Sequence, residues 1–171
     1  MKKLSLIIIV VLLSKISFAS DYNSEPQIFI TELVDDAISK LSNKDLNKEQ
    51  KAKFIEKIAL ENVDINALGL YTLGELRKTT DEINLKKYQQ VFEKYFLKSL
   101  TSRLTDYSSN KFEIMNADIK SSNYTIVKSK IVGSQNQPEI KIDWRIYTKN
   151  PQKPLIRDLI VEGLSLARTQ K

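Results

Sequence analysis

Cysteine and histidine are both absent from this chain of 171 residues. Without cysteine there can be no disulfide, no thiol nucleophile, no zinc finger and no cysteine-linked lipid. Without histidine the chain lacks the commonest general base and the commonest metal ligand. Glycine and proline are scarce, at four residues each, which argues against linker arrays and glycine-rich disorder. These absences predict a globular domain with no metal site, and they exclude most familiar kinds of catalytic centre.

Nucleotide-binding motifs are missing as well. The sequence has no P-loop, no dinucleotide-binding glycine motif and no nucleophile elbow. The paired acids Asp81 and Glu82 fall at the start of a predicted helix, where carboxylates favour the helix dipole. Asp158 and Glu162 are less ordinary, because they interrupt an apolar strand and by spacing share a face with Ile156 and Ile160. Two carboxylates can perform acid–base catalysis when their pKa values differ. With no second type of catalytic partner, we expect a structural role and no catalytic residue.

The first nineteen residues have the pattern of a secretory signal peptide. Lys2 and Lys3 precede the apolar run 4–13, which only Ser5 interrupts. At ~1.5 Å per residue this run spans about half of a bilayer core, too little for a membrane anchor. Small residues at Ser17 and Ala19 mark a cleavage site. We therefore expect a signal peptide over 1–19, cleavage between Ala19 and Ser20, export to the periplasm and one domain over 20–171.

Removal of the signal peptide changes the charge of the chain. Of the 27 basic residues three lie in 1–19, which has no acidic residue, so the net charge falls from +6 to +3. A weakly basic protein of this kind gives no support to nucleic-acid binding. Its charge suits a negatively charged surface or head group.

Helical periodicity dominates the first half of the mature chain. Apolar residues recur every three or four positions over 26–42, and Asn47 with Gln50 forms a capping-box pattern for a second helix to about residue 61. A third helix is predicted over 64–77. A second capping-box pattern at Thr79 and Glu82 opens the longest helix, over about 82–107, whose broad apolar face carries Tyr88, Val91, Phe92, Tyr95, Phe96, Leu100 and Leu104.

The second half of the chain predicts β-strands. Strands are expected over 112–119, 124–132, 140–147 and 155–161, joined by short polar turns. The clearest is 140–147, where Ile140, Ile142, Trp144 and Ile146 alternate with polar residues or tyrosine. Helices followed by consecutive strands predict an α+β domain, in which N-terminal helices pack on a four-stranded antiparallel sheet. Between these layers the surplus apolar side chains form either an ordinary core or a hydrophobic cavity.

The segment Asp158-Leu-Ile-Val-Glu162-Gly163-Leu-Ser165-Leu166 resembles the D-x-x-x-E-G-x-S-[LM] motif of the MlaC family, the auxiliary component of a lipid ABC transport system linked to toluene tolerance. The strand after Gln137-Pro138 also fits this family. The family's order of Leu-Gly, Arg, Thr, Phe, Leu, Leu and Tyr is matched upstream by Leu68, Gly69, Arg77, Thr80, Phe92, Leu100, Leu104 and Tyr107. The resemblance covers most of residues 27–169.

This resemblance implies a non-enzymatic periplasmic carrier that holds a glycerophospholipid as cargo and has no cofactor. It implies an inner-membrane Mla ABC complex and an outer-membrane MlaA-type lipoprotein complex as partners, in a pathway that maintains outer-membrane lipid asymmetry. We expect a monomer. Family members continue beyond the motif as a C-terminal helix, so we expect either that this copy is truncated at Lys171 or that the helix is absent. The predicted lining of the lipid cavity is Leu70, Tyr71, Phe92, Phe96, Leu100, Ile126, Ile140, Ile142, Trp144, Ile146 and Ile160.

Two other functions remain open on the sequence. One is a small cone-shaped α+β enzyme similar to ketosteroid isomerases, which would use Asp158 or Glu162 as its base. The other is a periplasmic chaperone-like module that binds unfolded or lipidated protein. Phospholipid in an organic extract would favour the carrier, whereas turnover that is lost in Glu162→Gln would favour the enzyme.

Overall fold

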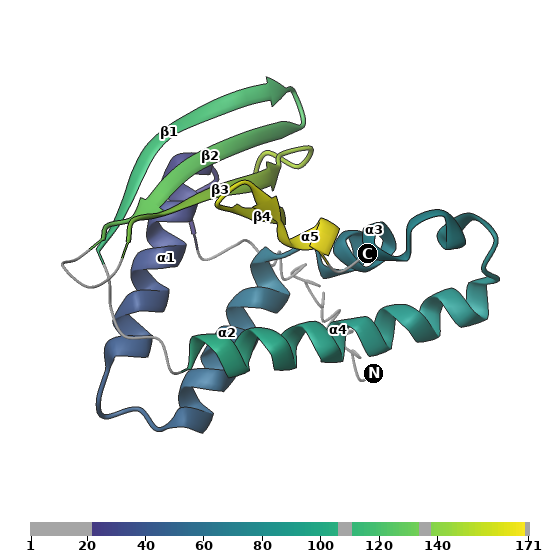
Figure 1. Cartoon of the computed structure of the whole chain (residues 1–171), viewed down its shortest axis with the longest axis horizontal. Helices are drawn as coiled ribbons and strands as arrows, with labels where there is room; N and C mark the ends of the chain where they lie inside the picture. Colours follow the sequence, from purple (N-terminus) through teal and green to yellow (C-terminus); the bar gives the residue numbers. More distant parts are fainter. Residues whose placement is uncertain (1–21, 106–110, 134–137, 170–171) are drawn as a thin grey trace, which may run out of the picture.

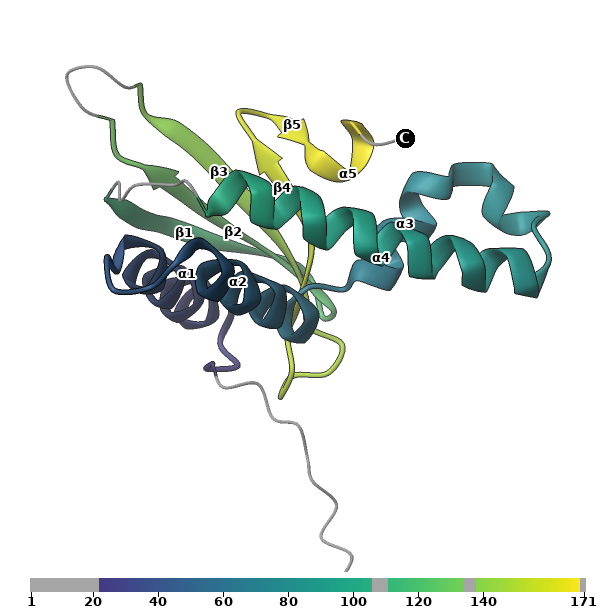
Figure 2. The same cartoon turned by 90° about the horizontal axis from the view of Figure 1, so that it is seen from below.

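The computed structural model describes residues 22–105, 111–133 and 138–169, and Figure 1 shows their arrangement. The predicted signal peptide and Tyr107 lie outside these residues. A curved sheet forms one layer and helices form the other (Figures 1 and 2). The α+β class and the antiparallel order of strands are thus confirmed.

Two helices, α1 (Pro26–Ser42) and α2 (Lys48–Asn62), match their predicted ranges closely. Glu25 caps α1 by accepting a hydrogen bond from the Ile28 backbone N–H at 2.9 Å. The predicted capping box of α2 is present, since the side chains of Asn47 and Gln50 each accept a backbone N–H of the other. Local sequence signals therefore set both helix starts.

The next helices form an arm that extends beyond the sheet (Figure 1). The arm consists of α3 (Ile65–Leu73), the 3-10 helix η1 (Gly74–Lys78) and the long α4 (Glu82–Leu104). The predicted cap of α4 at Thr79 is wrong, because Thr79 ends η1 and Asp81 caps α4 instead. The Asp81 carboxylate accepts the Asn84 backbone N–H at 2.9 Å, and hydrogen bonds from Asn84 lower the pKa of Asp81 below its ordinary value.

The sheet is a meander in the order β1-β2-β3-β4-β5. Its strands are β1 (Phe112–Ser121), β2 (Tyr124–Ile131), β3 (Ile140–Tyr147), β4 (Leu155–Val161) and β5 (Leu164–Ser165). The prediction of four strands missed β5, which is only two residues long and leads into the short α5 (Leu166–Thr169). A strand this short gives no periodic signal in a sequence.

One face of the sheet, here called the inner face, packs on α1 and α2. The fully buried residues Phe29 and Ile30 of α1 meet Val127 of β2 and Ile146 of β3 in a single core. Leu33, Ile58 and Ile156 complete this core, and Trp144 packs against it. These contacts bind the N-terminal helices to the middle of the sheet.

A β-bulge at Arg157 interrupts the alternation of side chains along β4. Ile156 pairs with Ile146 on the inner face, while Asp158 pairs with Arg145 on the opposite face. The expectation that Ile156 shares a face with Asp158 is therefore wrong, since the extra residue reverses the alternation. The Arg157 Nε donates to Asp64 Oδ2 at 2.9 Å, and its guanidinium carbon lies 3.3 Å from the centre of the Tyr147 ring. Because Asp64 caps α3, this ion pair fixes the start of the arm to the sheet.

Candidate functional site

A row of aromatic rings on α4 faces α3. Tyr88, Phe92 and Phe96 are spaced by four residues and stack with ring centres 6.0 and 6.3 Å apart. Opposite Phe92 lies Gly69 of α3, where an added Cβ would stand 2.9 Å from Phe92 Cδ1. The absence of a side chain at Gly69 thus lets the two helices approach each other.

Gly69→Ala should lower the free energy of unfolding by about 1 kcal/mol, because the new methyl group must displace the Phe92 ring. The gain in helix propensity from glycine to alanine, about 0.5–1 kcal/mol, only partly offsets this strain. Thermal unfolding followed by circular dichroism measures the difference. Asn66→Ala, an exposed position on the same helix, is the control and should be nearly neutral. A Gly69→Ala protein more stable than the parent would show that the ring does not restrict this position.

The aromatic row borders an open apolar depression of about 250 Å³, here called the apolar cavity, which is lined by Thr72, Tyr88, Val91, Phe92 and Tyr95. The hydroxyl groups of Thr72 and Tyr88 are 2.8 Å apart and hydrogen-bonded. Val91 and Tyr95 are 59% and 56% exposed, so the cavity opens to solvent along one side of α4. A second cavity of about 420 Å³ has a polar lining, formed by Asn66, Lys86, Gln89, Gln90, Glu93 and Lys94.

The predicted binding residues of β3 do lie on one face of the sheet. Ile142 pairs with Ser129, Trp144 with Val127 and Ile146 with Thr125, and these partners are all buried. Ile146 is fully buried in the core, so it serves packing. Ile140, Ile142 and Trp144 are only half-buried and provide apolar surface beyond the core.

The Trp144 indole is held in place by its neighbours. Its Nε1–H donates to Ser129 Oγ at 2.8 Å, and this hydroxyl donates in turn to the Ile142 carbonyl oxygen at 2.9 Å. The ring meets Phe112 edge to face, with centres 6.2 Å apart. Trp144 is therefore a rigid apolar surface with its polar atom satisfied.

The structure divides the predicted site residues into three groups. Those of the first group belong to α3 and α4 of the arm: Leu70, Tyr71, Phe92, Phe96 and Leu100. The β3 residues form the second group. Ile126 and Ile160 form the third, on the opposite face of the sheet, where Ile126 pairs with Asp118 and Arg145, and Ile160 pairs with Asp143. This face is rich in charged side chains, so Ile126 and Ile160 do not join the apolar surface of the other two groups.

Four residues of the apolar cavity were missing from the predicted lining: Thr72, Tyr88, Val91 and Tyr95. The sequence did contain a signal for three of them, because Tyr88, Val91 and Tyr95 belong to the broad apolar face predicted for the long helix. Thr72 had no such signal, since its place at the cavity depends on how α3 packs against α4.

The segment from Asp158 to Leu166 is a hairpin with a capped helix after it. Glu162 and Gly163 form the two-residue turn between β4 and β5. Their φ angles are 49° and 80°, and positive φ at both positions is typical of the type I′ turn of a β-hairpin. The Glu162 carboxylate accepts the backbone N–H of Lys141 on the neighbouring strand. This contact stabilises a backbone conformation that residues other than glycine rarely adopt.

Asp158 holds the end of this hairpin from a buried position. Its carboxylate accepts Ser165 Oγ–H at 2.6 Å and the Ala167 backbone N–H at 3.0 Å. Arg145 lies 3.6 Å from the same carboxylate. Ser165 Oγ accepts the Arg168 N–H at 3.1 Å and so caps α5. Both carboxylates of the motif thus have structural partners, and Asp158 is 5% exposed.

Over the residues that the structure describes, no group of acidic side chains is arranged to hold a metal ion. Within the same residues, no helix has the length and apolar character needed to cross a bilayer.

A comparison with models of protein families shows to which family the chain belongs. The model described as "MlaC protein" matches residues 31–171, most of the chain. The chain belongs to the MlaC family. A solved structure with a similar fold is that of the phospholipid-binding protein from Ralstonia solanacearum in complex with a phospholipid. It aligns with a TM-score of 0.66 and 14% sequence identity, over 82% of this chain and 80% of that one. A search of curated proteins finds no match.

Proposed function

We propose that this MlaC-family chain is a periplasmic carrier that binds a glycerophospholipid by its acyl chains. The observation that carries the proposal is the open apolar cavity on α4, in a fold similar to that of the Ralstonia protein in complex with a phospholipid. Its cargo passes between an outer-membrane MlaA-type lipoprotein complex and the inner-membrane Mla ABC complex, with the carrier acting as a monomer.

The energetics of lipid transfer explain why such a carrier needs apolar surface and no catalytic group. Two acyl chains contain on the order of 30 methylenes, and burial of each is worth ~0.8 kcal/mol, so exposure of both chains to water costs about 25 kcal/mol. The carrier must replace nearly all of this burial. Ordinary ligand pockets have volumes of about 300–1,000 Å³. The cavity on α4, at about 250 Å³, therefore accommodates part of one chain, and the exposed side chains beside it must cover the remainder.

The half-buried residues of β3 supply further apolar surface in this proposal. Ile140, Ile142 and Trp144 line the inner face beyond the packed core. They belong to β3, whereas the apolar cavity lies beside α4. A phospholipid with two chains then lies between the arm and the sheet. Phe92, Phe96 and Leu100 contact it from the arm.

The enzyme alternative finds no support in the geometry of the two carboxylates. A general base must be within reach of a substrate proton. Asp158 is buried with Ser165 and Ala167, and Glu162 accepts a backbone N–H, so each has a structural partner. We therefore propose binding without chemical conversion.

Mass spectrometry of an organic extract of the purified mature protein tests this function. We expect glycerophospholipid in an amount comparable to the protein, and none from an unrelated periplasmic protein of similar size purified in parallel. Extracts free of phospholipid, from a protein that also fails to take up phospholipid afterwards, would contradict the proposal. Bound unfolded protein in place of lipid would favour the chaperone-like alternative.

A further inference from the structure

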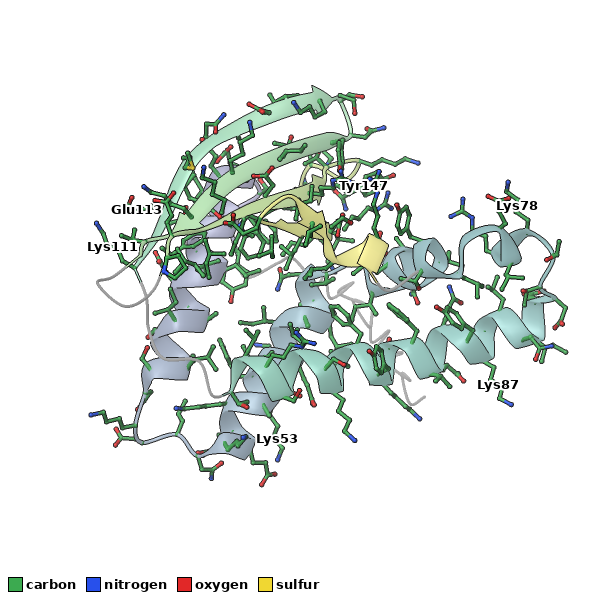
Figure 3. The ribbon with its side chains drawn as sticks, in the orientation of Figure 1. Lys53, Lys78, Lys87, Lys111, Glu113 and Tyr147 are labelled. Atoms are coloured by element: carbon green, nitrogen blue, oxygen red, sulfur yellow. The ribbon has the colours of Figure 1, made fainter. Side chains whose placement is uncertain are left out.

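One side of α4 carries exposed apolar and cationic side chains in a continuous row. Ile83, Lys87, Val91 and Tyr95 follow one another at intervals of four residues, so they are neighbours on the helix surface. We define the α4 stripe as this row together with the two lysines beside it: Ile83, Lys87, Val91, Lys94, Tyr95 and Lys98. All six are exposed, and Ile83 reaches 81%. Figure 3 shows Lys87 extending from the side of α4 that faces away from α3.

The charge of the α4 stripe is entirely positive. The two glutamates of α4, Glu82 and Glu93, immediately precede Ile83 and Lys94, and one residue turns the helix by about 100°. Both glutamates therefore project beside the stripe and outside it. Glu93 lines the polar cavity.

The three lysines of the stripe lack the carboxylate partners that some other lysines of the chain have. Lys53 pairs with Glu49, Lys78 with Glu75 and Lys128 with Asp118, at 2.7–2.8 Å. Within the described parts of the chain, Lys87, Lys94 and Lys98 form no ion pair. Their charge is thus available to an anionic partner.

We propose that the α4 stripe docks on a bilayer surface that contains anionic phospholipid. Helices that lie in a membrane interface combine lysines, which meet the head groups, with apolar side chains that enter the boundary of the acyl region. Lys87, Lys94 and Lys98 meet the phosphates in this arrangement, while Ile83 and Val91 insert between them. A protein partner would need acidic groups and apolar groups spaced to match this row, whereas the surface of an anionic bilayer offers both at every position.

Docking in this orientation brings the lipid site to the membrane. Val91 and Tyr95 belong both to the α4 stripe and to the lining of the apolar cavity. The mouth of the cavity then faces the bilayer, and an acyl chain can pass between the two without crossing bulk water. This inference rests on the proposed function, and it identifies the α4 stripe as the surface of the carrier that faces the membrane.

Flotation of the delipidated mature protein with vesicles tests the docking surface. We expect the protein to float with vesicles of phosphatidylcholine and phosphatidylglycerol, and to float poorly with vesicles of phosphatidylcholine alone. Added salt should weaken the interaction, because it screens exposed charges. Absence of flotation with either vesicle would overturn the proposal and point to an acidic protein as the partner of the stripe.

Paired variants separate the stripe from the overall charge of the protein. Lys87→Glu with Lys94→Glu should weaken vesicle binding at least about tenfold, since each lysine near an anionic surface contributes about fivefold in affinity. Lys44→Glu with Lys149→Glu makes the same change in net charge at two exposed positions away from α4, and should weaken binding far less. Ile83→Ser, which leaves the charge unchanged, should also reduce flotation. Equal loss in the two charge variants would overturn the proposal.

The phospholipid content of the same preparation before delipidation distinguishes this inference from the proposed function. A protein purified with phospholipid that does not float overturns only the docking surface. A protein that floats through its stripe but neither carries nor takes up phospholipid overturns only the carrier function.

Discussion

Val91→Asp should leave the protein folded and remove most of its bound phospholipid. Val91 is 59% exposed and lines the apolar cavity, so without lipid the new carboxylate stays hydrated and stability changes by only about 0.5 kcal/mol. With an acyl chain in place the carboxylate would lose water at a cost of several kcal/mol, and ion pairs with Lys87 and Lys94 on the adjacent turns of α4 would recover only about 0.5 kcal/mol each. We expect bound phospholipid per mole of protein to fall at least about tenfold. Phosphate analysis of extracts and circular dichroism measure the two properties.

Leu76→Asp provides the matched control for this prediction. Leu76 is 63% exposed on η1 and lies outside the cavity lining, so the same chemical change should spare the phospholipid content. Both variants should be reloaded from phospholipid dispersed in detergent, which removes any need for membrane docking. A Val91→Asp protein that reloads fully would exclude the cavity on α4 as part of the binding site.

Asp158→Ala should destabilise the fold by about 3 kcal/mol, because it removes the buried acceptor of the Ser165 hydroxyl and the Ala167 N–H and leaves both donors unpaired. Arg145 would also lose its only ion-pair partner within the described residues. For a domain of this size the melting temperature should fall by roughly 10 °C. Thermal unfolding at constant phospholipid content gives the comparison, since bound lipid shifts the midpoint.

Asp158→Asn tests whether the geometry or the charge of this side chain is responsible. The amide retains an oxygen that can accept the Ala167 N–H, so part of the lost stability should return. An alanine variant with an unchanged melting temperature would show that the carboxylate does not hold the hairpin. Asp158 would then again be a candidate for a chemical role.

Local features of the fold could be predicted because the sequence encodes them locally. The range of α1 and the capping box of α2 follow from side chains within a few positions of one another. The alternation along β3 depends only on strand geometry. The cap of α4 was mispredicted because Thr79 and Asp81 both offer an oxygen to a helix start. Only the chain path through η1, whose C-cap is Thr79, selects Asp81.

The errors in assigning faces have a different cause. The bulge at Arg157 inserts one residue into β4, and nothing in the sequence of that strand marks it. The bulge arises where Arg157 reaches Asp64, a residue far away in the chain. Ile126 and Ile160 were assigned to the cavity for their apolar character, but both lie on the opposite face, where Ile126 pairs with Asp118 and Arg145, and Ile160 pairs with Asp143 and Ser165. Assignment of a face requires the register between strands.

The candidate site was predictable as a helix face but not as a cavity. The spacing of apolar residues in the sequence of α4 is enough to predict that Tyr88, Val91 and Phe92 share one broad side of the helix. Which part of that side is covered depends on the approach of α3, since Phe92 packs on Gly69 while Val91 stays exposed. A contact between two helices, with a glycine at its closest point, thus determines where the apolar surface remains open.

Native mass spectrometry of the intact mature protein tests the central claim most directly. The account predicts species heavier than the polypeptide by the mass of glycerophospholipid, which disappear on delipidation and return after incubation with dispersed phospholipid. Val91→Asp should show mainly the bare mass under the same conditions. A wild-type protein that is folded, shows only the bare mass and stays bare after this incubation would contradict phospholipid binding by this chain.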